Sequence, residues 1–215
     1  MADAHPTARC AALVGPYTSG KTTLLEAMLF TAGAIPRKGR VSDGTSFGDS
    51  SAEARGRQMT AEPNLARFDY LGEAWTVIDC PGSVELGQDT LNALMVADIA
   101  VVVADAEPER AVSLSPVLKF LDDHGIPHLI FINKMDRASV RVSELLAALQ
   151  TASSRPRLLG QVPIREGEEI VGFFDLVSER AWRYQPDQPS ALIEVPEEVR
   201  ERGEEARREL MESLA

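Results

Sequence analysis

Two kinds of segment alternate along this chain of 215 residues. Short, continuous apolar runs bounded by turn residues are typical of strands buried in a parallel sheet. Between them lie segments in which apolar residues recur every three or four positions, the period of an amphipathic helix. This alternation predicts an α/β fold in which a mostly parallel sheet is flanked by helices.

The expected strands cover residues 11–14, 65–70, 74–78, 99–104 and 129–132, and the expected helices cover 21–32, 139–149 and a stretch around 117–121. A hairpin turn at residues 71–73 joins the second strand to the third. Residues 41–61 are rich in Ser, Gly, Asp and Arg and have no period, so we expect a long, mobile loop there.

The composition changes after about residue 151, and the length suits one domain with an appendage or two small domains. An apolar patch at residues 170–174 and a turn region near Gln185 precede a charged helix expected at residues 196–214. The apolar residues on one face of that helix are Val199, Ala206, Leu210 and Leu214.

Composition and charge narrow the class of protein. With 44% hydrophobic and 26% charged residues, the chain has the composition of a soluble globular protein. It contains neither a membrane-spanning run nor a secretory signal, so we expect a cytoplasmic protein. The 22 Lys and Arg residues stand against 33 Asp and Glu, which argues against binding free nucleic acid through the overall field. Cys10 and Cys80 are expected to be small, reduced, buried residues.

The segment GPYTSGKT, residues 15–22, matches the phosphate-binding pattern G-x-x-x-x-G-K-[ST] between a predicted strand and a predicted helix. Its glycines let the backbone wrap closely around phosphates, and its N–H groups favour an anion. Lys21 places a positive charge on the β- and γ-phosphates, and the Thr22 hydroxyl suits Mg²⁺. The alternative is a glycine turn before a surface helix. The candidate nucleotide contacts are Gly15, Thr18, Ser19, Gly20, Lys21, Thr22 and Thr23.

The run TVIDCPGSVEL, residues 76–86, begins with a predicted strand that ends at Asp79. In an α/β sheet this end faces the crevice where ligands bind, and behind a phosphate-binding loop such an Asp holds Mg²⁺ directly or through water. Gly82 can bring its N–H near a γ-phosphate. Alone, Asp-x-Pro-Gly would be an ordinary turn, but its place after the loop and a hairpin favours the functional interpretation.

Asn133-Lys134-Met135-Asp136 follows another apolar strand. The Asp136 carboxylate can accept hydrogen bonds from N1–H and the 2-amino group of guanine, a pair of donors that adenine lacks. A buried Asp136 would be left unpaired by ATP, at a cost of several kcal/mol. Three motifs in this order, each after a strand, indicate a guanine nucleotide.

Five segments carry a resemblance to a known family: GPYTSGKTTLLEAMLFTAG, GRVSDGTSFGD, NKMDR, VPIREGEEIVGFFDLVSERAWRY and EVPEEVRERGEEARRELMESLA. The chain resembles the G domain of a translational GTPase of the elongation factor G type, from about Arg9 to the end. The resemblance implies an N-terminal arm at residues 1–8 and a P-loop GTP-binding core at 9–158 that lacks its last guanine-contacting loop. It also implies part of an inserted G′-like subdomain at 159–215.

The resemblance also implies an activity. Proteins of this type act on the ribosome, commonly in translocation or recycling, and couple binding and hydrolysis of GTP to a conformational switch. It implies GTP or GDP and Mg²⁺ as cofactors, with Thr22, Thr60 and Asp79 at the metal and Lys21 and Gly82 beside the reacting phosphate. The ribosome and a guanine nucleotide are the expected partners, and no membrane is expected.

Three departures from the family pattern limit these expectations. Residues 56–60 read GRQMT where the family has E-R-G-I-T, so an ordinary polar loop residue is the alternative for Thr60. Ser83, our remaining catalytic candidate, stands where the family has a His that positions the attacking water. A serine hydroxyl neither reaches the same place nor carries positive charge. The chain also stops inside a subdomain, so we expect a fragment.

Ser83 leaves two interpretations of the activity open. One is a GTPase whose intrinsic hydrolysis is very slow or whose water is ordered by a residue supplied elsewhere, and the other is a binding switch with negligible turnover. A P-loop GTPase outside translation is a third. His5, His124 and His128 offer no obvious substitute for the missing His, and Glu85 is expected to be a surface carboxylate.

Overall fold

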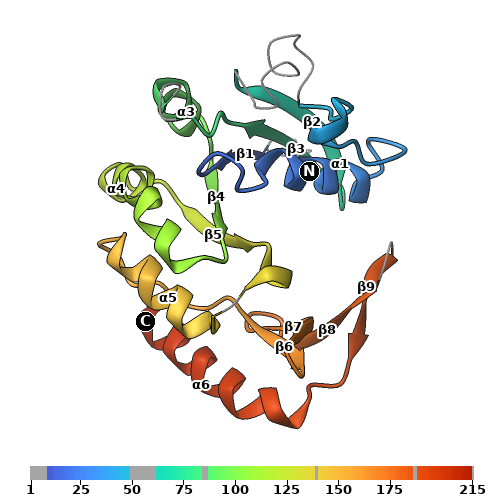
Figure 1. The fold of residues 1–215 in the computed structure, drawn as a ribbon, viewed down its shortest axis with the longest axis vertical. Helices are drawn as coiled ribbons and strands as arrows, with labels where there is room; N and C mark the ends of the chain where they lie inside the picture. Colours follow the sequence, from blue (N-terminus) through green and yellow to red (C-terminus); the bar gives the residue numbers. More distant parts are fainter. Residues whose placement is uncertain (1–8, 49–61, 84–86, 139, 186–187, 215) are drawn as a thin grey trace, which may run out of the picture.

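A computed structural model describes residues 9–48, 62–83, 87–138, 140–185 and 188–214 (Figure 1). Its central sheet has five strands in the order β2-β3-β1-β4-β5, and only the β2–β3 pair is antiparallel. The predicted α/β class with a mostly parallel sheet is therefore confirmed. The strands are β1 (Arg9–Val14), β2 (Asn64–Tyr70), β3 (Glu73–Asp79), β4 (Ile99–Asp105) and β5 (His128–Asn133).

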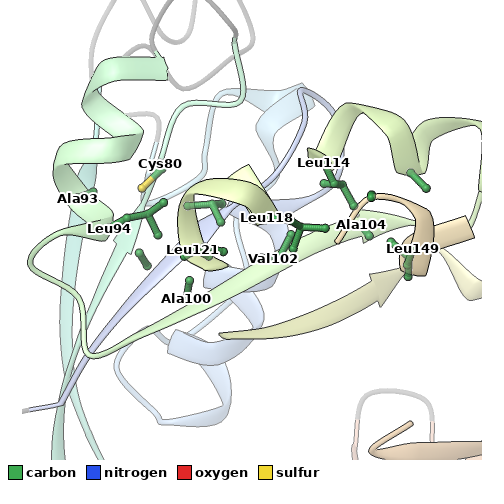
Figure 2. Packing of buried hydrophobic residues seen from close by; sticks show 14 of the residues in the cluster. Cys80, Ala93, Leu94, Ala100, Val102, Ala104, Leu114, Leu118, Leu121 and Leu149 are labelled. Carbon is green, nitrogen blue, oxygen red and sulfur yellow. The ribbon is translucent and has the colours of Figure 1, made fainter. Parts of the chain in front are cut away.

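Helices cover both faces of this sheet, so its inner strands are apolar on both sides. Ala11 and Leu13 of β1 face helix α1 (Lys21–Thr31), whose Leu25 and Leu29 are buried against them. Ala12 and Val14 of β1 face the opposite layer. That layer consists of α3 (Gly87–Leu94), the 3₁₀ turn η3 (Pro108–Leu114), α4 (Ser115–Asp123) and α5 (Val142–Thr151). Figure 2 shows Leu94, Leu114, Leu118, Leu121 and Leu149 of this layer gathered around Ala100 and Val102 of β4.

Most strands and α-helices of the central sheet and its two covering layers lie where the apolar pattern predicts them, with two differences. Helix α5 begins at Val142 rather than at residue 139, because Arg141 before it is extended. Helix α3 was not predicted, since only Ala93 and Leu94 of its eight residues are buried and so short a helix shows no apolar period. Of the expected loop at 41–61, the structure describes a 3₁₀ turn η1 (Val41–Asp43) and residues 44–48, and residues 49–61 lie outside the described part.

A second, antiparallel sheet follows in the order β6-β7-β8-β9, and this arrangement fits an inserted subdomain. Its elements are β6 (Gln161–Glu166), β7 (Glu169–Asp175), β8 (Arg180–Gln185), β9 (Gln188–Ile193) and the helix α6 (Glu197–Leu214), which runs along the lower edge in Figure 1. Val199, Ala206 and Leu210 of α6 pack on this sheet as predicted, and the side chain of Leu214 is not among those described. None of the described helices combines the length and the apolarity needed to cross a membrane.

A buried polar cluster joins the segment between the two sheets to the central sheet. Asp122, in the last turn of α4, accepts hydrogen bonds from the hydroxyls of Ser153 and Ser154 at 3.0 and 2.9 Å. The Arg157 guanidinium lies 3.4 Å from Asp122 and donates to His128 Nε2 at 2.7 Å. Burial raises the pKa of Asp122, but these hydroxyls and Arg157 outweigh it and hold the pKa below its ordinary value. The side chain of His128, the first residue of β5, is therefore held within this cluster by its hydrogen bond with Arg157.

Leu118→Ala should lower the free energy of unfolding by about 2–5 kcal/mol, because Leu118 is fully buried between α4 and the sheet. Leu129→Thr should change it by about 0.5 kcal/mol or less, because Leu129 is 46% exposed on the edge strand β5 and Thr suits a strand. Urea unfolding followed by circular dichroism measures both. Equal losses in the two variants would contradict this assignment of the core.

Candidate nucleotide-binding site

The phosphate-binding loop, residues 15–20, links β1 to α1 in a conformation that requires its two glycines. Gly15 and Gly20 have φ values of 143° and 97°, a region that favours glycine, and Thr18 between them has a φ of 64°. A Cβ on Gly15 would lie 2.3 Å from the Val103 carbonyl oxygen, and one on Gly20 would lie 2.3 Å from the Asn133 side-chain nitrogen. The glycines therefore let the loop pack directly onto the ends of β4 and β5.

Lys21, the first residue of α1, folds back across this loop. Its Nζ donates to the carbonyl oxygens of Gly15 and Pro16, both at 3.0 Å, and the residue is 6% exposed. Burial lowers the pKa of Lys21, and the nearby Asp79 carboxylate opposes that shift. The ammonium group is thus held at the loop, where the nucleotide phosphates bind in this motif.

Thr22 and Asp79 come together from different elements. Asp79 ends β3 and is fully buried, and Thr22 Oγ1 donates to Asp79 Oδ2 at 2.6 Å. Mg²⁺ prefers such oxygen ligands, and in nucleotide sites it takes one or two of them together with phosphates and waters. No group of three or more His, Cys, Asp or Glu side chains suited to a metal occurs among the described residues, so these two oxygens fit Mg²⁺ better than an all-protein site. Thr60, the third predicted ligand, lies outside the described part.

Gly82 packs against the phosphate-binding loop. A Cβ on Gly82 would lie 2.5 Å from Lys21 Nζ and 2.8 Å from the Tyr17 backbone nitrogen, so any larger residue would displace the loop. The backbone of Gly82 therefore lies beside the group expected to hold the phosphates. Ser83 follows directly and is half-buried, while Glu85 and His5 lie outside the described residues.

Cys80 separates Asp79 from the Pro81-Gly82 turn and is a free, fully buried thiol. Burial, together with the charge of Asp79, raises the pKa of Cys80 to about 12, so the thiol stays neutral and adds no charge beside the predicted metal ligands. Cys10 is also a free thiol but is only partly buried, because it lies near the start of β1.

Asn133 and Lys134 bind the phosphate-binding loop from the other side. Asn133 Nδ2 donates to the Ser19 carbonyl at 2.8 Å, and Lys134 Nζ donates to the Thr18 carbonyl at 2.7 Å. Two predicted nucleotide contacts thus also hold the loop in shape. Thr23, another predicted contact, is exposed on α1 next to Thr22.

Asp136 lies in the 3₁₀ turn η4 (Met135–Arg137), and its side chain is 76% exposed. Discrimination against ATP was predicted for the case of a buried Asp136, whereas here the turn η4 follows the edge strand β5 and the carboxylate is exposed. A paired Arg137 guanidinium lies 3.6 Å away. The base itself must therefore desolvate Asp136 for the carboxylate to discriminate guanine from adenine.

Asp105, which was not predicted from the sequence, pairs with two of the residues that hold the phosphate-binding loop, Lys134 and Arg110. Asp105 ends β4 with its side chain 1% exposed, and it forms ion pairs with Lys134 Nζ at 2.7 Å and with the Arg110 guanidinium. Arg110, from η3, also donates to the Tyr17 carbonyl at 3.2 Å. The available signal was an acid directly after an apolar strand, the same pattern that identified Asp79.

Glu26 was also not predicted from the sequence; it lies in α1 and is 2% exposed. Its carboxylate accepts hydrogen bonds from the backbone N–H groups of Gly39 and Phe47, in the loop that leads to the undescribed residues 49–61. A single acid within the apolar run LLEAML was the available signal.

Comparison with known proteins shows the family to which this chain belongs. Residues 7–210 match the model of the family described as "Elongation factor Tu GTP binding domain". The chain belongs to this family. Its similarity to the "Elongation factor G-like protein" of Synechocystis sp. (strain PCC 6803) is 47% identity over 207 residues, covering 96% of this chain and 31% of that protein. It is also 31% identical over 211 residues to "Elongation factor G 2" of Streptomyces coelicolor, covering 97% of this chain and 31% of that protein.

A crystal structure of a protein from Thermus thermophilus matches with a TM-score of 0.86 and 33% identity, covering 95% of this chain and 30% of that one. The chain thus spans about a third of the length of the relatives it matches. The resemblance read from the motifs and the fold class of a P-loop GTPase G domain are confirmed. This member of the elongation factor Tu GTP-binding family is a translation-elongation-factor type of domain, which implies binding of a guanine nucleotide.

Arg110→Gln should speed the release of a bound guanine nucleotide about five-fold. The variant removes a charge-assisted hydrogen bond to the loop, and the half-exposed position limits its worth to about 1 kcal/mol. Stopped-flow displacement of a fluorescent GDP derivative measures the rate. Arg208→Gln, on the exposed face of α6, is the matched control. An equal change in both variants would contradict a role for Arg110 at the loop.

Proposed function

We propose that this chain is the GTP-binding switch of an elongation factor G-like translation factor that acts on the ribosome. The observation that carries the proposal is the convergence of three separated motifs on one loop. Lys21 folds across the loop, the Thr22–Asp79 pair lies beside it, and Asn133 and Lys134 bind it from the other side. The names of the relatives, an elongation factor G-like protein and an elongation factor G 2, support the translational role. Such a factor works in the cytoplasm.

In this proposal different residues of the chain contact different parts of the nucleotide. The loop N–H groups and Lys21 bind the phosphates, and Asp136 accepts the two guanine donors. Thr22 and Asp79 hold Mg²⁺, which supplies charge neutralisation at the β- and γ-phosphates. Thr60 is a further ligand in this proposal. Gly82, close to Lys21, brings its N–H to the γ-phosphate and so makes the following segment sensitive to whether GTP or GDP is bound.

Hydrolysis in this chain is slow in our proposal, because Ser83 replaces the His that orders water in the family. The serine oxygen stays close to its own backbone and offers no cationic group to the developing negative charge. A residue supplied by the ribosome or by another part of the factor completes the site in the turnover-competent form. The enzyme is then a GTPase whose intrinsic rate is low.

A binding switch without turnover is the second candidate, and the positions of the two described histidines favour it. His128 is held by Arg157 at the start of β5, the end of the strand opposite Asn133. His124 follows α4, where its Nδ1 bonds to the Phe120 carbonyl at 2.9 Å. Neither residue is available beside the phosphate-binding loop, so no described histidine replaces the missing one.

Calorimetric titration in excess Mg²⁺ should show saturable binding of GDP and no signal with ADP. Asp136→Asn should weaken GDP by about ten-fold or more, because the amide cannot accept both guanine hydrogen bonds. The same variant should gain affinity for xanthosine diphosphate, whose 2-oxo group accepts a hydrogen bond from the Asn amide. Equal binding of GDP and ADP by the wild-type chain would contradict the guanine assignment.

Ser83→His should raise single-turnover phosphate release from GTP by about ten-fold or more, because an imidazole can hold and polarise the attacking water. Ser178→His, in an exposed turn of the second sheet, controls for adding a histidine anywhere. An unchanged rate in Ser83→His with intact GTP binding would show that position 83 does not limit hydrolysis.

A further inference from the structure

Glu26 is a buried acid to which neither the fold nor the nucleotide contacts assign a role. It lies on α1 four residues after Thr22, so both side chains are on the same face of the helix. No ion pair between described residues includes Glu26, although it is only 2% exposed. Burying a carboxylate is costly unless hydrogen bonds satisfy it, so its partners show what it does.

Both partners of Glu26 belong to one loop. Oε2 accepts a hydrogen bond from the Gly39 N–H at 2.7 Å, and Oε1 accepts one from the Phe47 N–H. Hydrogen bonds from backbone N–H groups to an ionised carboxylate are about twice as strong as neutral ones. The carboxylate therefore holds both ends of the loop at residues 39–47 against α1.

Hydrogen bonds within the loop also connect its two arms between Gly39 and Phe47. The Thr45 N–H donates to the Arg40 carbonyl at 3.1 Å, and the Arg40 N–H donates to Thr45 Oγ1 at 3.0 Å. A Cβ on Gly39 would lie 2.2 Å from the Thr45 carbonyl oxygen, so the two arms of the loop are in contact. Because the loop is compact, fixing its ends at Glu26 fixes the whole segment.

The loop ends over the predicted metal ligands. A Cβ on Gly48, the residue after Phe47, would lie 3.2 Å from Thr22 Cγ2 and 3.3 Å from Asp79 Oδ2. The Gly48 backbone therefore lies over these two side chains. Its position follows directly from the hydrogen bond that the Phe47 N–H makes to Glu26.

We propose that Glu26 is a positioning residue for the Mg²⁺-nucleotide site, because it anchors residues 39–48 to α1 and so sets the Gly48 backbone over Thr22 and Asp79. The inference rests on the proposed function, since it takes Thr22 and Asp79 as the metal ligands. Glu26 acts through the loop, because its hydrogen bonds go to the backbone N–H groups of Gly39 and Phe47. Its effect is expected in the part of the nucleotide affinity that depends on Mg²⁺, and not in the contacts of the phosphate-binding loop itself.

Amide hydrogen exchange of the ¹⁵N-labelled chain tests the anchor without any nucleotide. Glu26→Gln keeps the shape of the side chain but turns an NH₂ group towards one of the two N–H donors, which then loses its acceptor. Exchange at Gly39 or Phe47 should become about ten-fold faster, the change that corresponds to losing one hydrogen bond of about 1.4 kcal/mol. Exchange at Leu25 and Leu29 in the core should stay as in the wild type. Unchanged exchange at both loop amides would overturn the inference.

GDP titrations in saturating Mg²⁺ and in excess EDTA test the consequence. Glu26→Gln should weaken GDP about five- to ten-fold in Mg²⁺ and less than two-fold in EDTA. Gly48→Val leaves Glu26 intact and should give the same pattern, because its side chain pushes the backbone off Thr22 and Asp79. This second variant keeps the test valid if Glu26→Gln folds poorly. Glu144→Gln, an exposed acid in the first turn of α5, is the matched control and should change neither value.

The outcomes separate this inference from the proposed function. A loss of affinity in Glu26→Gln that is equal with and without Mg²⁺ would mean a merely structural role and overturn the inference alone. Wild-type binding of GDP that does not depend on Mg²⁺ would overturn both the metal role of Thr22 and Asp79 and the inference. Faster exchange at the loop amides together with a loss confined to Mg²⁺ supports it.

Discussion

Every backbone carbonyl of the phosphate-binding loop has a hydrogen-bond donor, and the architecture around the loop follows from this requirement. A loop that directs its N–H groups towards phosphates turns its carbonyl groups the other way, and buried carbonyls need partners. Neighbouring strands and helices supply them. The donors are Lys21 for Gly15 and Pro16, Arg110 for Tyr17, Lys134 for Thr18, Asn133 for Ser19 and the Leu24 N–H for Gly20.

The cationic donors create a second requirement. Positive charges that are held close together repel one another, so a carboxylate must lie near them to offset the repulsion. Asp105 at the end of β4 serves both Arg110 and Lys134, and Asp79 at the end of β3 lies near Lys21. Both acids lie at the carboxyl ends of parallel strands, which is the edge of an α/β sheet where ligands bind. Lys134 therefore has two connections, because it belongs to the predicted guanine motif and also holds the phosphate-binding loop through the Thr18 carbonyl.

Local patterns in the sequence were sufficient for the strands of the central sheet, the long helices and the three nucleotide motifs, because each depends on residues close together along the chain. The missed parts depend on contacts between distant residues. Arg110 meets Tyr17 across 93 positions, and Glu26 meets Phe47 across 21 positions. Neither pair leaves a local period or spacing. Helix α3 was missed for a different reason, since it buries only two side chains. The exposure of Asp136 depends on β5 lying at the sheet edge, which strand patterns alone do not reveal.

The cluster around Asp122 holds one end of strand β5 in place. Its first residue, His128, is clamped by Arg157 from the segment that leads to the second sheet, and its last residue, Asn133, is clamped to the phosphate-binding loop. Both ends of the strand are thus held by side-chain hydrogen bonds. Strand β7 of the second sheet also lies next to the turn η4 that carries Asp136. The second sheet is therefore linked to strand β5 at two places: at its first residue through the segment that carries Arg157, and at the turn after its last residue through β7.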